Sequence, residues 1–313
     1  MRESFFRVLL DMAERHEDIY LLTADMGFKL FDSFRERYPD RFLNVGIAEA
    51  NMIGIAAGLS LSGKNVYCYS IIPFLIMRAY EQIRIDVACQ NLNVKLVGVG
   101  GGFTYGLEGF THFGIEDLSL MRSLPNMSMV IPADTREAEK LAEISYEYPS
   151  PLYIRLGRAG EPLIHTNTPS FEIGKGLVLV EGKDVAIFAI GSMVYQAVRA
   201  IDIIRKEGLS VTLVNMHTLK PLDVRLIKQC ASTHRAIFTV EEHTVVGGLG
   251  SAVAEVLAES SYGGVFRRIG IPESLKNFVG NASCLQEKYG LTAEGIAESI
   301  MRMTQKESAW SGR

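Results

Sequence analysis

Short apolar runs alternate with amphipathic stretches in the first half of the chain. Runs of strand length lie at residues 19–25, 41–45, 64–70, 93–100, 127–134 and 151–157. Between them, residues 1–16, 80–90 and 135–148 place apolar side chains at helical spacing. Short apolar strands that alternate with helices are typical of a parallel sheet covered on both faces. The pattern therefore predicts an α/β domain.

The alternation lapses after Gly157 and then resumes. Residues 161–177 are rich in Pro, Thr, Asn and Gly, which predicts a linker. Further strands are expected at 184–191, 210–216, 235–243 and 264–272, with helices at 193–208, 223–233, 247–261 and 292–306. We predict two α/β domains, residues 1–158 and 183–313, joined by a linker at 159–182. The tail at 306–313 is expected to be disordered.

Composition excludes several classes of protein. The formal net charge is −4 and no block is rich in Lys and Arg, which argues against nucleic acid or an acidic membrane as partner. No apolar run reaches the roughly 20 residues that a membrane span needs. Acidic residues stand near the start, where a signal peptide would be apolar. The four cysteines are scattered without metal-like spacing, so we expect reduced thiols in a cytoplasmic protein.

Glu49 is the single charge between Arg41 and Lys64. An acid in the first turn of a helix could simply favour the positive end of the helix dipole. The residues that follow, 50–61, leave little polar face, so we expect a helix buried on all sides. An unpaired carboxylate there is expensive to ionise, and burial raises its pKa. Such a carboxyl suits a hydrogen bond to a ring nitrogen, which favours a functional role.

Three further features could carry chemistry. His112 follows a glycine-dense segment, 100–109, that comes after a predicted strand. A lone histidine is more often structural, but the end of a strand in an α/β sheet is the usual ligand crevice. Phe74 is either a core residue or a flat surface for an aromatic ring. Glu241, Glu242 and His243 could suggest a metal or acid-base site, although a contact between domains or subunits is the favoured interpretation.

The ordered series of motifs resembles the transketolase family. Residues 44–63, 78–84 and 106–134 are similar to its pyrimidine-binding domain. Residues 173–193, 217–223 and 241–259 are similar to its C-terminal domain. The likeness is greatest to the C-terminal subunit of a transketolase split into two polypeptides. It implies a thiamine-diphosphate-dependent enzyme that moves a two-carbon ketol unit from a ketose, or its phosphate, to an aldose.

One family motif is missing from this sequence. The family binds Mg²⁺ and the cofactor's diphosphate through a GDG motif and a later Asn-Asn pair, and neither the motif nor the combination occurs here. The resemblance therefore implies a separate N-terminal subunit that holds Mg²⁺ and shares thiamine diphosphate with this chain. We expect an α2β2 assembly with sugars or sugar phosphates as substrates.

The resemblance assigns roles around the cofactor. It makes Glu49 the acid that hydrogen-bonds N1′ of the aminopyrimidine, and His112 the histidine that faces the donor's hydroxyl groups. Phe74 matches the ring that stacks on the pyrimidine. Ile71 stands where a second aromatic residue is expected, so that wall of the pocket is altered. Asp25 matches an acidic position near the cofactor, against a plain strand-end acid as the alternative.

The substrate end departs from the family pattern. Arg2 and Arg158 align with arginines that clamp the substrate phosphate, although Arg2 could instead belong to a disordered terminus. Lys29 stands in place of a phosphate-binding serine, and Glu108 in place of an aspartate. Gly100 replaces a histidine. These changes favour transketolase chemistry on a non-standard sugar.

Three alternatives stay open at this point. Deoxyxylulose-phosphate synthase and the β subunit of a 2-oxoacid dehydrogenase share the glutamate and much of the fold. Residues 111–122 and 241–255 favour transketolase over the dehydrogenase, and the synthase is normally one long chain. The third alternative is a non-catalytic subunit that scaffolds or regulates a thiamine enzyme.

Overall fold

The computed structural model describes residues 1–274 and 278–308. Its first half runs through α1 (Arg2–Ala13), β1 (Ile19–Thr23), α2 (Asp32–Arg37), η1 (Pro39–Arg41), β2 (Phe42–Asn44), α3 (Glu49–Leu61), β3 (Asn65–Ile71), α4 (Ile72–Met77), α5 (Tyr80–Gln82), η2 (Ile83–Ala88), β4 (Val94–Val99), η3 (Gly106–Glu108), η4 (Phe110–His112), α6 (Asp117–Ser123), β5 (Ser128–Val130), α7 (Thr135–Glu147) and β6 (Leu152–Leu156).

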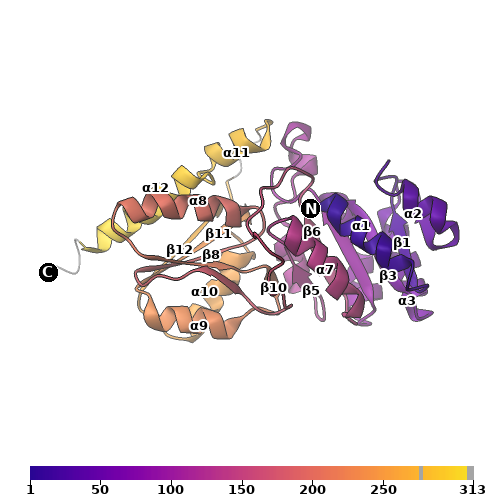
Figure 1. Cartoon of the computed structure of the whole chain (residues 1–313), viewed down its shortest axis with the longest axis horizontal. Helices are drawn as coiled ribbons and strands as arrows, with labels where there is room; N and C mark the ends of the chain where they lie inside the picture. The colour runs from indigo at the N-terminus through magenta and orange to yellow at the C-terminus, as the bar shows by residue number, and fades with distance from the viewer. Residues whose placement is uncertain (275–277, 309–313) are drawn as a thin grey trace.

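The second half continues the alternation. It contains β7 (Leu177–Val180), β8 (Val185–Ala189), α8 (Met193–Lys206), β9 (Val211–Asn215), β10 (Thr218–Lys220), α9 (Val224–Thr233), β11 (Ala236–Thr244), α10 (Leu249–Glu259), β12 (Val265–Ile271), α11 (Ala282–Lys288) and α12 (Ala293–Ser308). Figure 1 shows the two halves as two units side by side along the longest axis.

Two largely parallel sheets form these units. The first has seven strands in the order β10-β5-β6-β4-β3-β1-β2, and the second has five in the order β12-β11-β8-β9-β7. In β3, Val66 and Cys68 face the core cluster beneath α3, whereas Tyr67 and Tyr69 face the cluster beneath α1 and α7. This alternation buries both faces of the sheet. The predicted fold of two α/β domains is confirmed.

Strand β10 joins the two units and was not predicted. It belongs to the second half of the chain, yet it pairs antiparallel with β5 of the first sheet. It is short and is followed by Pro221, so neither its length nor its pattern indicates a strand. One core cluster also crosses the junction, because Met129 and Ile131 lie in the same cluster as Met216 and Leu219.

Two expectations about connecting segments need correction. Strand β7 lies inside the predicted linker at 159–182 and pairs antiparallel with β9. Earlier in that segment, the backbone N–H groups of Ile164 and His165 each donate to the Asp134 carboxylate at 2.9 Å. The predicted disordered tail at 306–313 is helical through Ser308, and residues 309–313 lie outside the described part of the chain.

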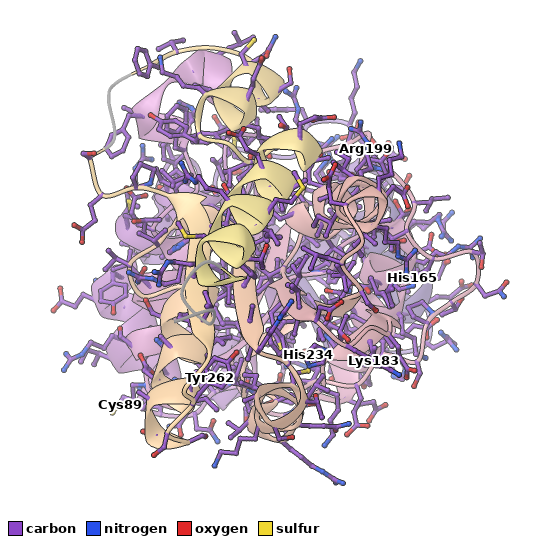
Figure 2. All side chains as sticks on the ribbon, turned by 90° about the vertical axis from the view of Figure 1, so that its left-hand side faces the viewer. Cys89, His165, Lys183, Arg199, His234 and Tyr262 are labelled. Carbon is purple, nitrogen blue, oxygen red and sulfur yellow. The ribbon has the colours of Figure 1, made fainter. Side chains whose placement is uncertain are left out.

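All four cysteines are free thiols, as predicted. Cys68 and Cys230 are buried, Cys89 and Cys284 are exposed, and Figure 2 shows Cys89 near the lower end of the molecule. Within residues 1–274 and 278–308, no helix combines the length and the apolar character that crossing a bilayer requires.

Candidate active site

The candidate residues gather at one edge of the first sheet. Asp25 follows β1, Ile71 ends β3, Gly100 follows β4 and Arg158 follows β6. These strands are parallel neighbours, so their carboxyl ends meet along the same edge. Ligands of open α/β sheets bind outside the carboxyl ends of the strands. The topology therefore places the sequence-predicted residues at the usual crevice.

Glu49 is buried at the first turn of α3, with its side chain 3% exposed. Nη1 of Arg78 donates to both carboxylate oxygens, at 3.1 Å and 3.2 Å. The carboxylate that was expected to be unpaired is thus held by a guanidinium. Arg78 itself is 47% exposed, so its side chain reaches the buried acid from the solvent side.

Helix α3 is not buried on all sides, which corrects the prediction. Its buried residues, besides Glu49, are Met52, Ile53, Ala56 and Ala57. The exposed residues on its opposite side are Asn51, Gly54, Gly58 and Leu61. The apolar composition therefore covers two different surfaces, of which one packs on the sheet and the other is open.

Phe74 lies beside this ion pair and not deep in the core. The guanidinium carbon of Arg78 is 4.0 Å from the centroid of the half-buried Phe74 ring. The same guanidinium therefore contacts the carboxylate of Glu49 and the face of Phe74. Arg78 follows Phe74 by four residues, and it was missed although such spacing places two side chains on the same side of a helix.

His112 lies against the other side of Phe74. The two rings meet edge to face, with centroids 4.9 Å apart. Nδ1 of His112 is 2.9 Å from Oγ1 of Thr111. The ring of Tyr105 lies beyond, 6.2 Å from that of His112, centroid to centroid. The sequence analysis gave Tyr105 no role.

Two arginines extend this row toward the N-terminus. The Arg158 guanidinium carbon is 5.4 Å from the centroid of the Tyr105 ring. Arg2 lies close to Tyr69 and Tyr105, and burial raises the pKa of the Tyr69 phenol to about 12 although Arg2 opposes this. Arg2 is the first residue of α1, so the alternative of a disordered terminus is wrong.

Lys29, Asp25 and Glu108 lie at the margins of the row. Lys29 and Arg2 both line a cavity of about 530 Å³. The backbone N–H of Asp25 donates to Oδ1 of Asn44 at 2.9 Å, and the same oxygen accepts from Gly46 at 3.1 Å. Asn44, which the sequence analysis missed, therefore ties the end of β1 to the loop before α3. Glu108 is exposed on η3.

Glycines 101 and 102 serve the protein's own packing. The sequence predicted positive φ or close approach of a ligand, and Gly102 has a φ of 64°. A Cβ on Gly101 would lie 2.8 Å from Cζ of Arg155, and one on Gly102 would lie 2.3 Å from Cδ of Glu242. The missing side chains make room for buried charged groups that join the two units.

The acidic and histidine residues 241–243 form a contact between the domains, as favoured from the sequence. Oε2 and Oε1 of Glu241 accept from the N–H groups of Leu249 and Gly250 at the start of α10, at 2.7 Å and 2.8 Å. His243 reaches across the junction, where its Nε2 accepts from the N–H of Leu118 in α6 at 3.2 Å. Burial lowers the pKa of His243 to about 4, which keeps this acceptor neutral.

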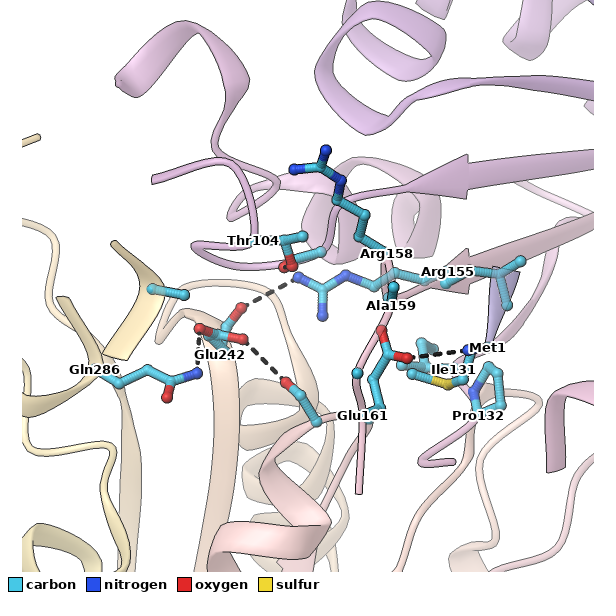
Figure 3. A pocket seen from close by; sticks show the side chains of 17 residues that line it. Met1, Thr104, Ile131, Pro132, Arg155, Arg158, Ala159, Glu161, Glu242 and Gln286 are labelled. Carbon is cyan, nitrogen blue, oxygen red and sulfur yellow. Dashed lines mark hydrogen bonds and ion pairs between the residues drawn. The ribbon is translucent and has the colours of Figure 1, made fainter. Parts of the chain in front are cut away.

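A second cavity of about 420 Å³ lies at the junction (Figure 3). Glu242 on its wall accepts hydrogen bonds from Ser192 and Gln286, at 2.9 Å and 2.8 Å. Arg155 pairs with the buried Asp117 at 2.9 Å. Arg158 also lines this cavity, but Glu49 and Phe74 do not. In the part of the chain that the structure describes, no group of three His, Cys, Asp or Glu side chains is arranged to hold a metal ion.

Comparison with known proteins explains this arrangement. Residues 1–160 match the transketolase pyrimidine binding domain, and residues 174–296 match the transketolase C-terminal domain. The chain belongs to the transketolase family. Membership implies dependence on thiamine diphosphate, so the Glu49 edge of the first sheet belongs to the domain named for the cofactor's pyrimidine.

Relatives of similar length carry related names. One of the two subunits of an apulose-4-phosphate transketolase from Phocaeicola vulgatus is 38% identical over 97% of this chain and 97% of its own length. A 6-deoxy-6-sulfo-D-fructose transketolase subunit from Clostridium sp. (strain MSTE9) is 36% identical over 98% and 95%. A solved structure of a split gene transketolase, described as an inactive beta4 tetramer, superposes with a TM-score of 0.88 at 38% identity, covering 96% of this chain and 97% of that one.

Proposed function

We propose that this chain is the C-terminal, pyrimidine-binding subunit of a split transketolase. The enzyme transfers a two-carbon ketol unit from a ketose or its phosphate to an aldose acceptor. The observation that carries the proposal is the contact of one planar cation, the Arg78 guanidinium, with both Glu49 and Phe74.

That contact tests whether the residues fit the cofactor. The Arg78 guanidinium is flat, donates N–H groups to a buried carboxylate and lies over an aromatic face. An aminopyrimidine hydrogen-bonded to Glu49 and stacked on Phe74 makes the same demands, so these residues fit the pyrimidine of thiamine diphosphate. Since Arg78 now holds both groups, its half-exposed side chain has to turn aside when the pyrimidine binds.

Each residue then has a stated task. When bound, thiamine diphosphate supplies the carbon nucleophile and stores the electrons. Glu49 holds the proton at the ring nitrogen N1′, and the Phe74 ring fixes the orientation of the pyrimidine. His112, set between Phe74 and Tyr105, is placed to exchange a proton or a hydrogen bond with a substrate hydroxyl group.

The positive end of the site favours a sugar with an anionic terminus. Arg158 and Arg2 lie around Tyr105, and Lys29 shares a cavity with Arg2. Guanidinium groups suit phosphate because they can bind it with two parallel hydrogen bonds, and a lysine adds a point charge. The names of the two relatives describe a phosphate sugar and a sulfo sugar, which supports the same substrate class here.

Exposed apolar residues support a partner subunit at this edge. Phe28 is 77% exposed, Ile47 75% and Leu107 70%, and the open side of α3 adjoins Ile47. Apolar residues gathered on one surface are typical of an interaction site. We propose that an N-terminal subunit covers this surface, contributes the Mg²⁺ and diphosphate site, and forms an α2β2 assembly with this chain.

The alternatives fare less well. A synthase-like or dehydrogenase-like component would also need Glu49, but residues 111–122 and 241–255 follow the transketolase pattern. A purely scaffolding subunit would have no need to keep Glu49, Phe74 and His112 in one contiguous row.

The test is reconstitution with the N-terminal subunit and an assay of ketol transfer over a panel of free and phosphorylated ketoses. Glu49→Ala should lower kcat by roughly 10²–10⁴-fold because a group that holds a proton during the reaction is lost. Binding of thiamine diphosphate, measured by calorimetry, should weaken in the same variant. Normal turnover by Glu49→Ala would refute the assignment.

A further inference from the structure

Gly100 stands where the transketolase resemblance calls for a histidine, and another side chain fills the space beside it. Its φ is 91°, in the region that favours glycine. A Cβ on Gly100 would lie 2.3 Å from Cε2 and 2.4 Å from Cδ2 of Tyr105. The aromatic ring therefore packs directly on the bare Cα, and the ring and a side chain at position 100 exclude each other.

The ring lies between the two ends of the site. On one side its centroid is 6.2 Å from that of His112, which in turn meets Phe74 at 4.9 Å. On the other side the Arg158 guanidinium lies 5.4 Å from the ring centroid. A sugar that reaches from the cofactor side at Glu49 and Phe74 to the cation at Arg158 has to pass Tyr105.

The phenol can interact with a polar substrate. Tyr105 is half-buried, and its hydroxyl can donate and accept a hydrogen bond. Burial raises the pKa of the phenol, against the opposing effect of Arg158 and Arg2, and it thus carries its proton at neutral pH. The absent imidazole could likewise donate and accept, so the two groups are interchangeable in kind.

We propose that Tyr105 takes the place of the missing histidine as a specificity-determining residue, its hydroxyl bonding a sugar hydroxyl between the reacting carbonyl and the anionic end. The inference rests on the proposed function, because it assumes that a sugar occupies this row. Gly100 and Tyr105 act as one unit: the glycine leaves the space and the tyrosine fills it.

The first test is Tyr105→Phe in the complex with the N-terminal subunit, which keeps the ring and removes only the hydroxyl. With the best sugar-phosphate donor of the panel, KM should rise roughly three- to tenfold while kcat changes little. With hydroxypyruvate, a donor too short to reach Tyr105, KM should not change. An unchanged KM for the sugar phosphate, or an equal rise for both donors, would overturn the proposal.

The second test asks whether the pair acts as a unit. Gly100→Ala should displace the ring and raise KM about as much as Tyr105→Ala, and the double variant should be no worse than Tyr105→Ala. Gly63→Ala is the matched control, because Gly63 has a φ of 80° with open space around it and lies far from the row. Thermal unfolding of each variant separates strain from loss of contact.

These outcomes distinguish the inference from the function on which it rests. A wild-type complex that transfers no ketol unit from any donor contradicts the proposed function itself. An active complex in which the Gly100→Ala and Tyr105→Ala effects on KM multiply as independent changes contradicts only the role of Tyr105.

Discussion

Two buried glutamates of this chain stand at or beside the start of a helix and are held in opposite ways. Glu241 accepts hydrogen bonds from two backbone N–H groups at the start of α10, and those donors cannot leave. Glu49 is held by the side chain of Arg78, which is half-exposed and free to turn. A carboxylate satisfied by fixed donors serves the fold, whereas one satisfied by a removable side chain can be passed to a ligand.

The largest expected effect on stability comes from breaking the fixed arrangement. Glu241→Ala leaves the buried N–H groups of Leu249 and Gly250 without an acceptor, and we expect a loss of about 2–4 kcal/mol in the free energy of unfolding. Urea unfolding at pH 7 measures it. Glu241→Gln, which keeps one acceptor oxygen, should recover part of the loss.

Glu49→Ala is the contrasting variant in the same experiment. Because Arg78 can turn to solvent when the acid is removed, unfolding should change by less than about 1 kcal/mol while activity is lost. If Glu49→Ala destabilised the chain as much as Glu241→Ala, the distinction between the two carboxylates would fail.

Acid should weaken the fixed contacts next. The pKa of His243 is lowered by burial from 6.5 to about 4, so the unfolded state binds its proton more tightly. The contribution of His243 is therefore fully present above pH 6.5 and is lost as pH falls toward 4. Between pH 7 and pH 5 we expect a loss of about 2 kcal/mol from this group.

His243→Gln provides the control for the acid effect. Its amide oxygen can still accept from Leu118 but does not titrate, so the pH dependence should become shallower. It should not vanish, because burial also lowers the pKa of His217 to about 4. Identical slopes for the wild type and His243→Gln, in unfolding measured from pH 7 to pH 5, would contradict this assignment.

The smallest expected effect is on the removable partner. Arg78→Ala should change the free energy of unfolding by less than about 1 kcal/mol, since its ion pair with Glu49 is half-exposed. Binding of thiamine diphosphate in the reconstituted complex should strengthen or weaken by only a few-fold, because a competitor and a neighbour are removed together. Loss of folding in Arg78→Ala, seen by circular dichroism, would show that the pair is structural.

Much of this could be predicted from the sequence, for physical reasons. Period and composition indicate the strands and helices because burial imposes them locally. A single acid in an apolar run also stands out locally, which is why Glu49 was found.

What the sequence analysis missed depends on contacts between distant segments. Tyr105 gains meaning only when its ring is seen to pack on Gly100 and beside Arg158. Strand β10 gains it only when β5 is seen alongside, since three residues carry too little pattern of their own. Helix α3 is apolar throughout, and composition alone does not reveal which of its sides faces the sheet.

The pairing of β10 with β5 bears on how the molecule can be divided. A protein ending after the first unit would present the bare rim of β5, with amide and carbonyl groups ready to capture a strand from another molecule. Truncation at that point thus invites aggregation, and engineering that shuffles the halves among homologues has to carry residues 218–220 along with the amino-terminal module.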